Sequence, residues 1–338
     1  METHVTFAFI IIVLALIFDF LNGFHDAANS IATVVVTRVL RPFQAVLMAG
    51  VANFFGFIIF GVTIAKTIGT GIVDSSVITL PIIFAALVGA IIWNILTWLL
   101  GLPTSSSHAL IGGLVGSTLT AIGISAIKVL GVVKIFTFIF IAPLLGMLGA
   151  VIFTSIIIWI FHTMNRERIN LLFKRLQLIS AALYSMGHGT NDAQKTMGVI
   201  TLVLFSSGMI PAFEVKGWVA FSCYFAIALG TVFGGWRIVK TMGTNITKIR
   251  PMEGFCAETS AGLVLFGTAH FGIPVSTTHV IAGSIMGVGT VEGVKNVRWA
   301  TARKIIWAWI LTIPLSATFA SITFLIITGL SHIYHVRF

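Results

Sequence analysis

The sequence predicts an all-α polytopic membrane protein with two homologous repeats, which we expect to be inverted and to contain broken helices and re-entrant hairpins. Three observations predict this fold class: the composition, the long uncharged runs and a pair of duplicated polar motifs. Apolar residues make up 57% of the 338 residues and charged residues 9%, and the mean hydropathy is +1.06. Soluble domains carry about a quarter charged residues. A soluble fold is therefore excluded.

Runs without Asp, Glu, Lys or Arg set the number of membrane segments. They cover 42–65, 75–127, 135–165, 196–213, 217–236, 259–291 and 305–336. A spanning helix needs roughly 20 residues, so the longer runs can hold two spans or a span and a hairpin. The runs are continuous and rich in glycine, unlike the short alternating strands of a membrane barrel. We therefore expect a helical bundle of about 10 to 12 membrane segments.

The ends, the loops and the cysteines complete this description. The first 20 residues lack a basic start and a cleavage site, so we expect them to form a retained first membrane helix. The formal net charge of +10 lies largely in short loops, and the positive-inside rule places loops 163–176 and 237–250 in the cytoplasm. Nucleic acid is not an expected partner, because no soluble domain could hold a duplex.

Cys223 and Cys256 lack metal or disulfide spacing and are expected to be packing residues.

Two pairs of motifs reveal an internal duplication. Residues 22–32 match residues 188–198 at an offset of 166. Residues 101–108 match residues 272–279 at an offset of 171, in the same order along the chain. We divide the chain into a first transport repeat (1–134), a linking membrane helix with a cytoplasmic basic loop (135–176), a second repeat (177–295) and a C-terminal membrane helix (296–338).

The first motif places an aspartate in apolar surroundings in each half. A buried carboxylate costs several kcal/mol unless it is paired or hydrated, and nearby glycines at 23, 189 and 198 are expected to unwind the helices and free backbone carbonyls. Such oxygen-rich sites suit Na⁺ or a proton. The predicted coupling-ion ligands are Asn22, Asp26, Asn29, Asn191 and Asp192, and the two aspartates would hold the metal if the ion is Na⁺. The alternative is that these side chains only join helices by hydrogen bonding.

The second motif combines a helix stop with hydroxyl side chains. Proline ends one helix and Ser or Thr caps the next, so backbone N–H groups, hydroxyls and helix dipoles converge on an anion site suited to tetrahedral oxyanions. The predicted phosphate-type ligands are Thr104, Ser105, Ser106, Ser107, Ser276, Thr277 and Thr278. The alternative is that the serine-rich turns serve packing. His108 and His279 follow at matching positions and either bond the substrate or lock the hairpins.

Further polar residues fall on the expected pathway. Lys195 replaces Asn29 across the repeat, and it either neutralises Asp192 or attracts an anion. Glu258 is another intramembrane acid and is assigned to the pathway. Asp19, one turn before the first motif, is open to the same two interpretations as the other acids.

Duplicated halves with broken helices predict a secondary transporter with its site between the repeats. A membrane hydrolase using Ser107 and His108, or Thr278 and His279, is disfavoured because adjacent residues point about 100° apart on a helix. No Gly-x-Ser-x-Gly elbow accompanies them, and catalysis would not need two copies. We therefore do not expect an enzyme. An ion channel is also disfavoured, because coupled transport explains paired buried acids beside an anion site better than a channel does.

The motifs are similar over most of the chain to those of the inorganic phosphate transporter (PiT) family, in particular its short bacterial members. The family signature G-x-N-D-x-x-N is matched at residues 23–29 except at His25 and at residues 189–195 except at Lys195, and the pattern P-x-S-[ST]-[ST]-H is present at 103–108 and 274–279. The resemblance implies a multi-pass symporter of the bacterial inner membrane, driven by a proton or sodium gradient and without a cofactor. Its implied partners are inorganic phosphate, alone or complexed with a divalent metal, and membrane lipid; a homo-oligomer is left open.

Two departures from the family pattern bear on the coupling ion and the linker. His25 stands where the family has Asn, so we add it to the coupling-ion ligands. An imidazole titrates near physiological pH and favours proton coupling. The extended soluble loop of animal members is replaced by the short basic loop 163–176. A sulfate or other oxyanion permease of the same fold is the alternative function.

Overall fold

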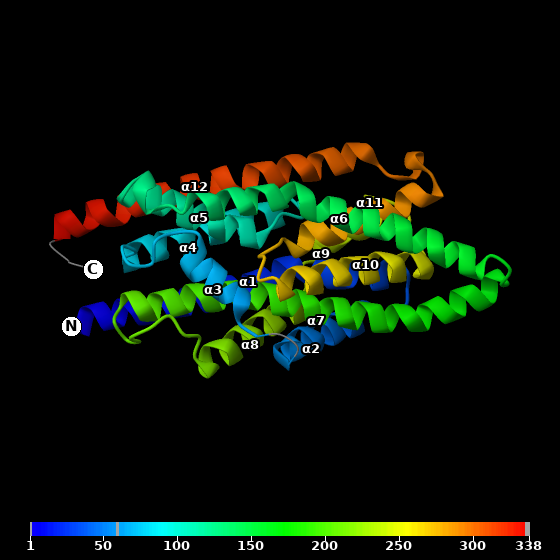
Figure 1. Ribbon diagram of the computed structural model, residues 1–338, viewed down its shortest axis with the longest axis horizontal. Coiled ribbons are helices and arrows are strands. Elements are labelled where there is room, and N and C mark those ends of the chain that lie inside the picture. Colours follow the sequence, from blue (N-terminus) through cyan, green and yellow to red (C-terminus); the bar gives the residue numbers. More distant parts are fainter. Residues whose placement is uncertain (1, 59–60, 335–338) are drawn as a thin grey trace.

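The computed structural model describes residues 2–58 and 61–334, which are almost entirely helical (Figure 1). The first half comprises α1 (Glu2–Val36), α2 (Pro42–Phe55), α3 (Thr63–Gly71), α4 (Leu80–Leu99), α5 (Ser106–Ala121) and α6 (Val129–Phe161). The second comprises α7 (Arg166–Ser206), α8 (Gly217–Phe233), α9 (Trp236–Thr244), α10 (Pro251–His270), α11 (Thr277–Glu292) and α12 (Trp299–Tyr334). Short 3₁₀ turns lie at Gly56–Ile58, Ile124–Ala126 and Val294–Asn296. The predicted all-α class is confirmed.

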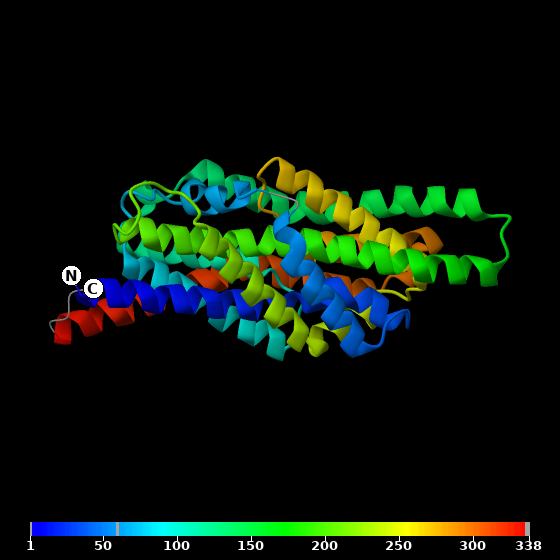
Figure 2. The same cartoon turned by 90° about the horizontal axis from the view of Figure 1, so that it is seen from below.

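The order of helices in the first half recurs in the second. Helices α3 and α9 have 9 residues each, α4 and α10 have 20, and α5 and α11 have 16. Both α6 and α12 contain an internal proline, Pro143 and Pro314. Helix α1 starts at the end of the bundle where α12 finishes, whereas α7 starts at the opposite end, after the turn that follows α6 (Figures 1 and 2). The boundary expected at residue 176 falls inside α7.

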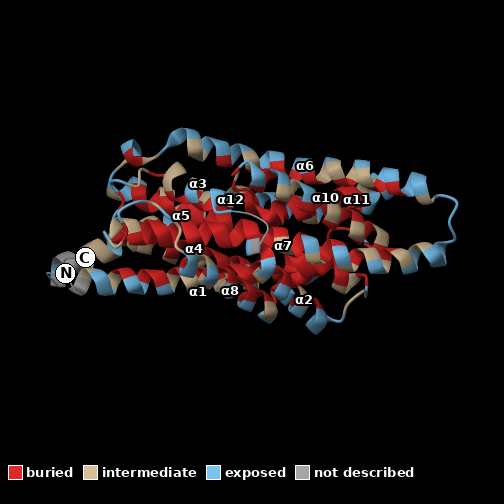
Figure 3. Cartoon of the chain, turned by 60° about the horizontal axis from the view of Figure 1, so that its bottom comes forward, coloured by how far each residue is buried: buried red, intermediate tan, exposed pale blue. Residues whose placement is uncertain are grey.

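The outer surface of the bundle is apolar enough to contact membrane lipid. Among the described residues, four helical stretches are long and apolar enough to cross a membrane: His4–Val36, Leu80–Leu99, Val129–Phe161 and Trp299–Leu330. A fifth span is possible by the same criteria if α8 and α9, which bend by 73°, form one broken span. Large apolar side chains face outward along α6, among them Trp159 at 76% exposure and Leu148 at 58%. Buried residues gather in the middle of the bundle, along α5 and α7 (Figure 3).

The helices that carry the two aspartates are continuous, so the expected unwinding at glycine is wrong. Helix α1 passes through Gly23 without a break, and α7 passes through Gly189 and Gly198. These glycines instead allow close packing. A Cβ atom on Gly23 would lie 2.1 Å from the carbonyl oxygen of Ile227, and one on Gly189 would lie 2.5 Å from that of Asn53. The motif therefore brings α1 against α8 and α7 against α2.

Two helical hairpins, α4–α5 and α10–α11, turn inside the protein. They enter from opposite ends of the bundle (Figure 1). Each turns at a glycine with positive φ, Gly101 at 65° and Gly272 at 63°, a conformation that favours glycine. The serine hydroxyls that cap the second helices, Ser105 and Ser276, each accept a bond from the backbone N–H three residues later at 3.2 Å. Helix α5 packs on α12 and α11 packs on α6, so both hairpin tips are held in the interior.

Candidate transport site

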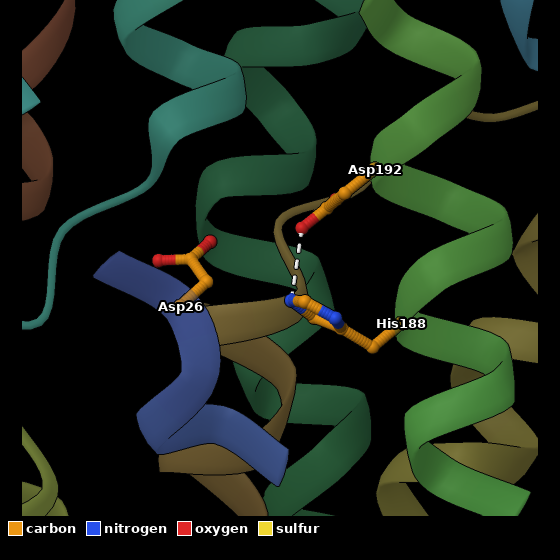
Figure 4. A group of neighbouring side chains, drawn as sticks. All are labelled: Asp26, His188 and Asp192. Atoms are coloured by element: carbon orange, nitrogen blue, oxygen red, sulfur yellow. Dashed lines mark ion pairs between the residues drawn. The ribbon is translucent and has the colours of Figure 1, made fainter. Parts of the chain in front are cut away.

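The two motif aspartates meet at one place, although they come from different halves. Asp26 of α1 and Asp192 of α7 lie beside His188, which is one turn before Asp192 (Figure 4). One ligand atom from each of the three residues lies within 4.8 Å of the others, and all three side chains are buried. The His188 Nε2 atom is 3.2 Å from Asp192 Oδ2. The repeat thus builds one shared acidic site.

Lys195 connects this acidic site to both hairpin tips. Its Nζ atom donates to Asp192 Oδ1 at 2.6 Å, to Ser107 Oγ of the first tip at 2.6 Å and to the Val275 carbonyl of the second tip at 2.8 Å. The residue is 1% exposed. A buried ammonium normally has a counter-charge, and Asp192 supplies it. The same ammonium contacts both hairpin tips, so it could supply positive charge to an anion held between them.

The second tip is tied to both motif helices by hydrogen bonds. Thr277 donates from Oγ1 to Asp192 Oδ2 at 3.0 Å, and Asn29 of α1 donates from Nδ2 to Thr278 Oγ1 at 2.9 Å. The Tyr184 hydroxyl of α7 donates to the backbone carbonyl of Thr277 at 3.2 Å. Side chains of α1 and α7 are therefore hydrogen-bonded to the start of α11.

In the first half, a histidine makes the corresponding connection. His25 Nδ1 lies 2.6 Å from Asp26 Oδ1, and its Nε2 lies 3.2 Å from the hydroxyl of Thr97 on α4. Thr104 of the first tip donates to the Thr97 hydroxyl at 2.9 Å and lies 3.5 Å from His25 Nε2. An imidazole thus links Asp26 to the first tip, as an ammonium links Asp192 to both tips.

Several buried oxygen atoms at the site have no hydrogen-bond partner among the described residues. They include the side-chain oxygens of Asn22, Asn29, Asn191 and Ser106. Buried polar atoms without partners are uncommon, and carbonyl and carboxylate oxygens are the ligands that hard cations prefer. The residues present therefore fit a small cation or a proton near the two aspartates.

The tip histidines lie beside each other. The His108 and His279 rings are 4.8 Å apart and T-shaped, and His279 stacks on Trp309 of α12 at 4.0 Å. The Trp309 indole donates to the Pro103 carbonyl at 2.9 Å. This arrangement favours the hairpin-locking interpretation of the two histidines.

Glu258 of α10 forms a second buried cluster between α1, α7 and α10. Its Oε1 accepts a bond from Thr33 at 2.5 Å and one from Gln177 at 3.1 Å, and its Oε2 accepts one from Ser180. Thr37 extends the cluster by donating to Gln177 Oε1 at 2.9 Å. Glu258 therefore lies apart from the Lys195 contacts and is joined to the site through α1 and α7.

The chain is similar to known proteins over most of its length. The profile of the phosphate transporter family matches residues 22–320, which contain both motifs and both hairpins. The chain belongs to the phosphate transporter family. A protein of Rhizobium meliloti (strain 1021) named probable low-affinity inorganic phosphate transporter is 52% identical over 93% of this chain and 94% of its own length. A protein of the same name from Bacillus subtilis (strain 168) is 43% identical over 97% and 99%.

A solved structure has the same fold. The structure, described as the sodium-dependent phosphate transporter, superposes with a TM-score of 0.88 over 96% of this chain and 99% of that one, at 24% identity. Family membership makes this chain a phosphate transporter of the PiT family and not an enzyme. It is a multi-pass protein of the plasma membrane.

Three residues of the site were not predicted from the sequence: His188, Tyr184 and Thr97. His188 could have been found, because it lies four residues before Asp192 and so one turn away on the same helical face. Tyr184 continues that face by another turn. Thr97 offers no comparable signal, since only the fold of the α4–α5 hairpin places it next to His25.

Proposed function

We propose that the protein takes up inorganic phosphate by symport with a cation, a proton or Na⁺, and that phosphate binds between the two hairpin tips. The observation that carries this proposal is the position of Lys195, whose ammonium contacts both tips and Asp192 at once. Each tip is also the N-terminus of a 16-residue helix, α5 or α11, where backbone N–H groups and the helix dipole attract an anion.

Phosphate binding competes with Asp192 for the ammonium of Lys195. An anion between Ser107 and Thr277 draws the ammonium toward itself and weakens the bond of 2.6 Å to Asp192 Oδ1. The Asp192 carboxylate is fully buried, and a buried carboxylate without a counter-charge is costly. Asp192 therefore binds a cation when phosphate is bound.

Coupling follows from this competition. The cation stabilises the phosphate-bound state because it replaces Lys195 beside Asp192, and phosphate stabilises the cation-bound state by the same free energy. Asp26, Asn22 and Asn29 supply further oxygens on the α1 side, and Asn191 supplies one from α7. His25 beside Asp26 favours a proton. Na⁺ is the second candidate, since a protein of the same fold is named sodium-dependent.

Transport across the membrane then requires the site to face each side in turn. We infer that the halves form an inverted repeat, because corresponding helices run in opposite directions and the hairpins enter from opposite ends (Figure 1). Rocking of one repeat against the other would open the site to alternate sides. The linker turn and the basic segment before α10 would lie on the cytoplasmic side. We propose a complex of phosphate with a divalent metal as a further form of the substrate.

The alternative substrate is sulfate, and the site contains a feature that discriminates against it. The Val275 carbonyl accepts a bond from Lys195 Nζ at 2.8 Å, and it would lose this donor if the ammonium moved toward a bound anion. Hydrogen phosphate carries a proton and can donate to an acceptor, whereas sulfate at neutral pH only accepts. A site with a buried acceptor rejects a ligand that leaves the acceptor unpaired. The geometry therefore favours phosphate.

The test is uptake of labelled phosphate into proteoliposomes that contain the purified protein, with the sodium gradient, the pH gradient, Mg²⁺ and sulfate varied one at a time. We expect saturable uptake that needs a cation gradient and that persists in a large excess of sulfate. Uptake that sulfate abolishes would favour the oxyanion alternative. Uptake without dependence on any cation gradient would contradict symport.

A further inference from the structure

Asp19 is a buried acid that the proposed site does not use. It lies on α1 seven residues before Asp26, which places it two turns, about 10 Å, toward the start of the helix. Its exposure is 0%. Thr196 of α7 donates from Oγ1 to Asp19 Oδ1 at 2.8 Å, while Asp19 Oδ2 has no hydrogen-bond partner in the part of the chain that the structure describes.

No basic side chain of the described residues forms an ion pair with Asp19. The titratable groups that face it are Asp192 of α7 and Cys223 and Tyr224 of α8. Of the other helices packed on α1, α2 and α4 contain no titratable side chain, and that of α5 is His108, which packs against His279.

The remaining neighbours of α1 meet it further along its length. Helix α11 bonds to Asn29, α10 bonds to Thr33, and α9 packs on Ala32. The groups around Asp19 are thus acidic, thiol or phenolic, and none of them balances a negative charge.

The scaffold does not require an acid at this position. The repeat offset of 166 pairs Asp19 with Ser185, whose hydroxyl bonds to the Ala181 carbonyl of its own helix at 2.8 Å. Glu258 is likewise unmatched, because the offset of 171 pairs it with Leu87. Each half therefore carries a buried acid close to the motif helices that has no counterpart in the other half. Thr33, the α1 partner of Glu258, lies seven residues after Asp26, so the two acids flank the central site on opposite sides.

The groups around Asp19 determine whether it binds a metal cation or a proton. A cation such as Na⁺ needs several oxygen ligands, but the described side-chain contacts here supply only the carboxyl group and the Thr196 hydroxyl as oxygens, together with the Cys223 thiol, which is a soft ligand. A proton needs a single oxygen, and Asp19 Oδ2 is free to hold it. A protonated carboxyl is neutral and so avoids the cost of an unpaired buried charge.

We propose that Asp19 binds the transported proton on the side of the central site where α1 begins, and passes its protonation state to Lys195 through Thr196. Thr196 is the next residue to Lys195, so a change in its bond to Asp19 acts on the backbone that positions the ammonium. The basic loops at the other end of the bundle place this side outside the cell. The inference rests on the proposed symport and names the proton as the coupling ion.

The variant Asp19→Asn tests this proposal, because asparagine keeps the shape of a neutral aspartic acid and cannot release a proton. Two assays in proteoliposomes separate the roles: net phosphate uptake driven by a pH gradient, and exchange of labelled for unlabelled phosphate without a gradient. Where loss of one proton limits the rate, wild-type net uptake falls about tenfold per unit rise in external pH. We expect Asp19→Asn to lose that pH dependence and gradient-driven accumulation while it retains exchange.

Matched variants exclude a purely structural role. Ser185→Ala at the repeat-equivalent position should leave both assays unchanged, and Asp19→Glu should restore the pH dependence. Thr196→Val removes the hydrogen bond but keeps the acid, so accumulation should weaken without losing its pH dependence. Asp19→Asn with a wild-type pH profile, or with exchange lost together with net uptake, would overturn the proposal. Wild-type uptake driven by sodium alone would overturn it while leaving phosphate transport intact, and a wild-type protein without phosphate uptake would overturn both.

Discussion

Replacing Asp192 with asparagine is expected to abolish net phosphate uptake. Asp192 is the charge partner of Lys195 at 2.6 Å and accepts further contacts from Thr277 and His188. The asparagine leaves a buried ammonium without its counter-charge, and breaking a buried ion pair costs about 3 to 5 kcal/mol. It also removes the group that we expect to bind the coupling cation, so phosphate binding and cation binding become independent.

Two measurements on Asp192→Asn separate these effects. Labelled uptake should fall by about a hundredfold or more, the factor that corresponds to about 3 kcal/mol. Phosphate binding to the purified variant should persist and lose its dependence on the cation, because Lys195 no longer needs to leave Asp192. The control is Asp74→Asn, in an exposed loop where Ser76 bonds to the carboxylate and holds the pKa of Asp74 below its usual value. Normal accumulation by Asp192→Asn would refute the proposed coupling.

The second large effect is expected for Asp26→Asn. Asp26 does not contact Lys195 in the described structure; its side-chain contact is with His25 Nδ1 at 2.6 Å, and its carboxylate lies beside His188 and Asp192. The asparagine keeps the size of the side chain but removes one of the two negative charges that would hold the cation. Accumulation should therefore be lost although the Lys195 contacts to both tips remain.

The cation dependence of phosphate binding distinguishes Asp26→Asn from a folding defect. The variant should reach the membrane in normal amount and bind phosphate, and a higher concentration of Na⁺ or protons should be needed for the cation to strengthen that binding. Asp26→Glu serves as the matched control, since it keeps the charge and lengthens the side chain by one methylene. An Asp26→Asn protein that accumulates phosphate with wild-type cation dependence would remove Asp26 from the coupling site.

The hairpins could be predicted from the sequence because their signals are local. Gly101 and Gly272 are suited to positive φ, the prolines that follow stop the first helix, and Ser105 and Ser276 cap the second. Each of these effects acts within a few residues. The pairing of Asp26 with Asp192 followed from the duplication, since a two-part scaffold brings equivalent residues to its interface.

The shape of the motif helices could not be predicted in the same way. Glycine in a helix permits either unwinding or close packing, and only the neighbouring helix decides between them. At Gly23 the carbonyl of Ile227 leaves no room for a side chain, so the glycine serves packing and α1 stays helical through the motif. The same limit applies to Lys195. Its sequence position allowed contact with Asp192 or with an anion, and the three-dimensional arrangement puts it next to Asp192 and to both tips.

The position of the bound anion tests the central claim most directly. Crystals grown with arsenate, which has the charge and shape of phosphate, allow the arsenic to be located by its anomalous scattering. We predict one strong peak between the starts of α5 and α11, with arsenate oxygens about 3 Å from Ser107 Oγ and Lys195 Nζ, and a distance from Lys195 Nζ to Asp192 Oδ1 that is longer than 2.6 Å. A peak away from the hairpin tips, with Lys195 still bonded to Asp192, would contradict the account.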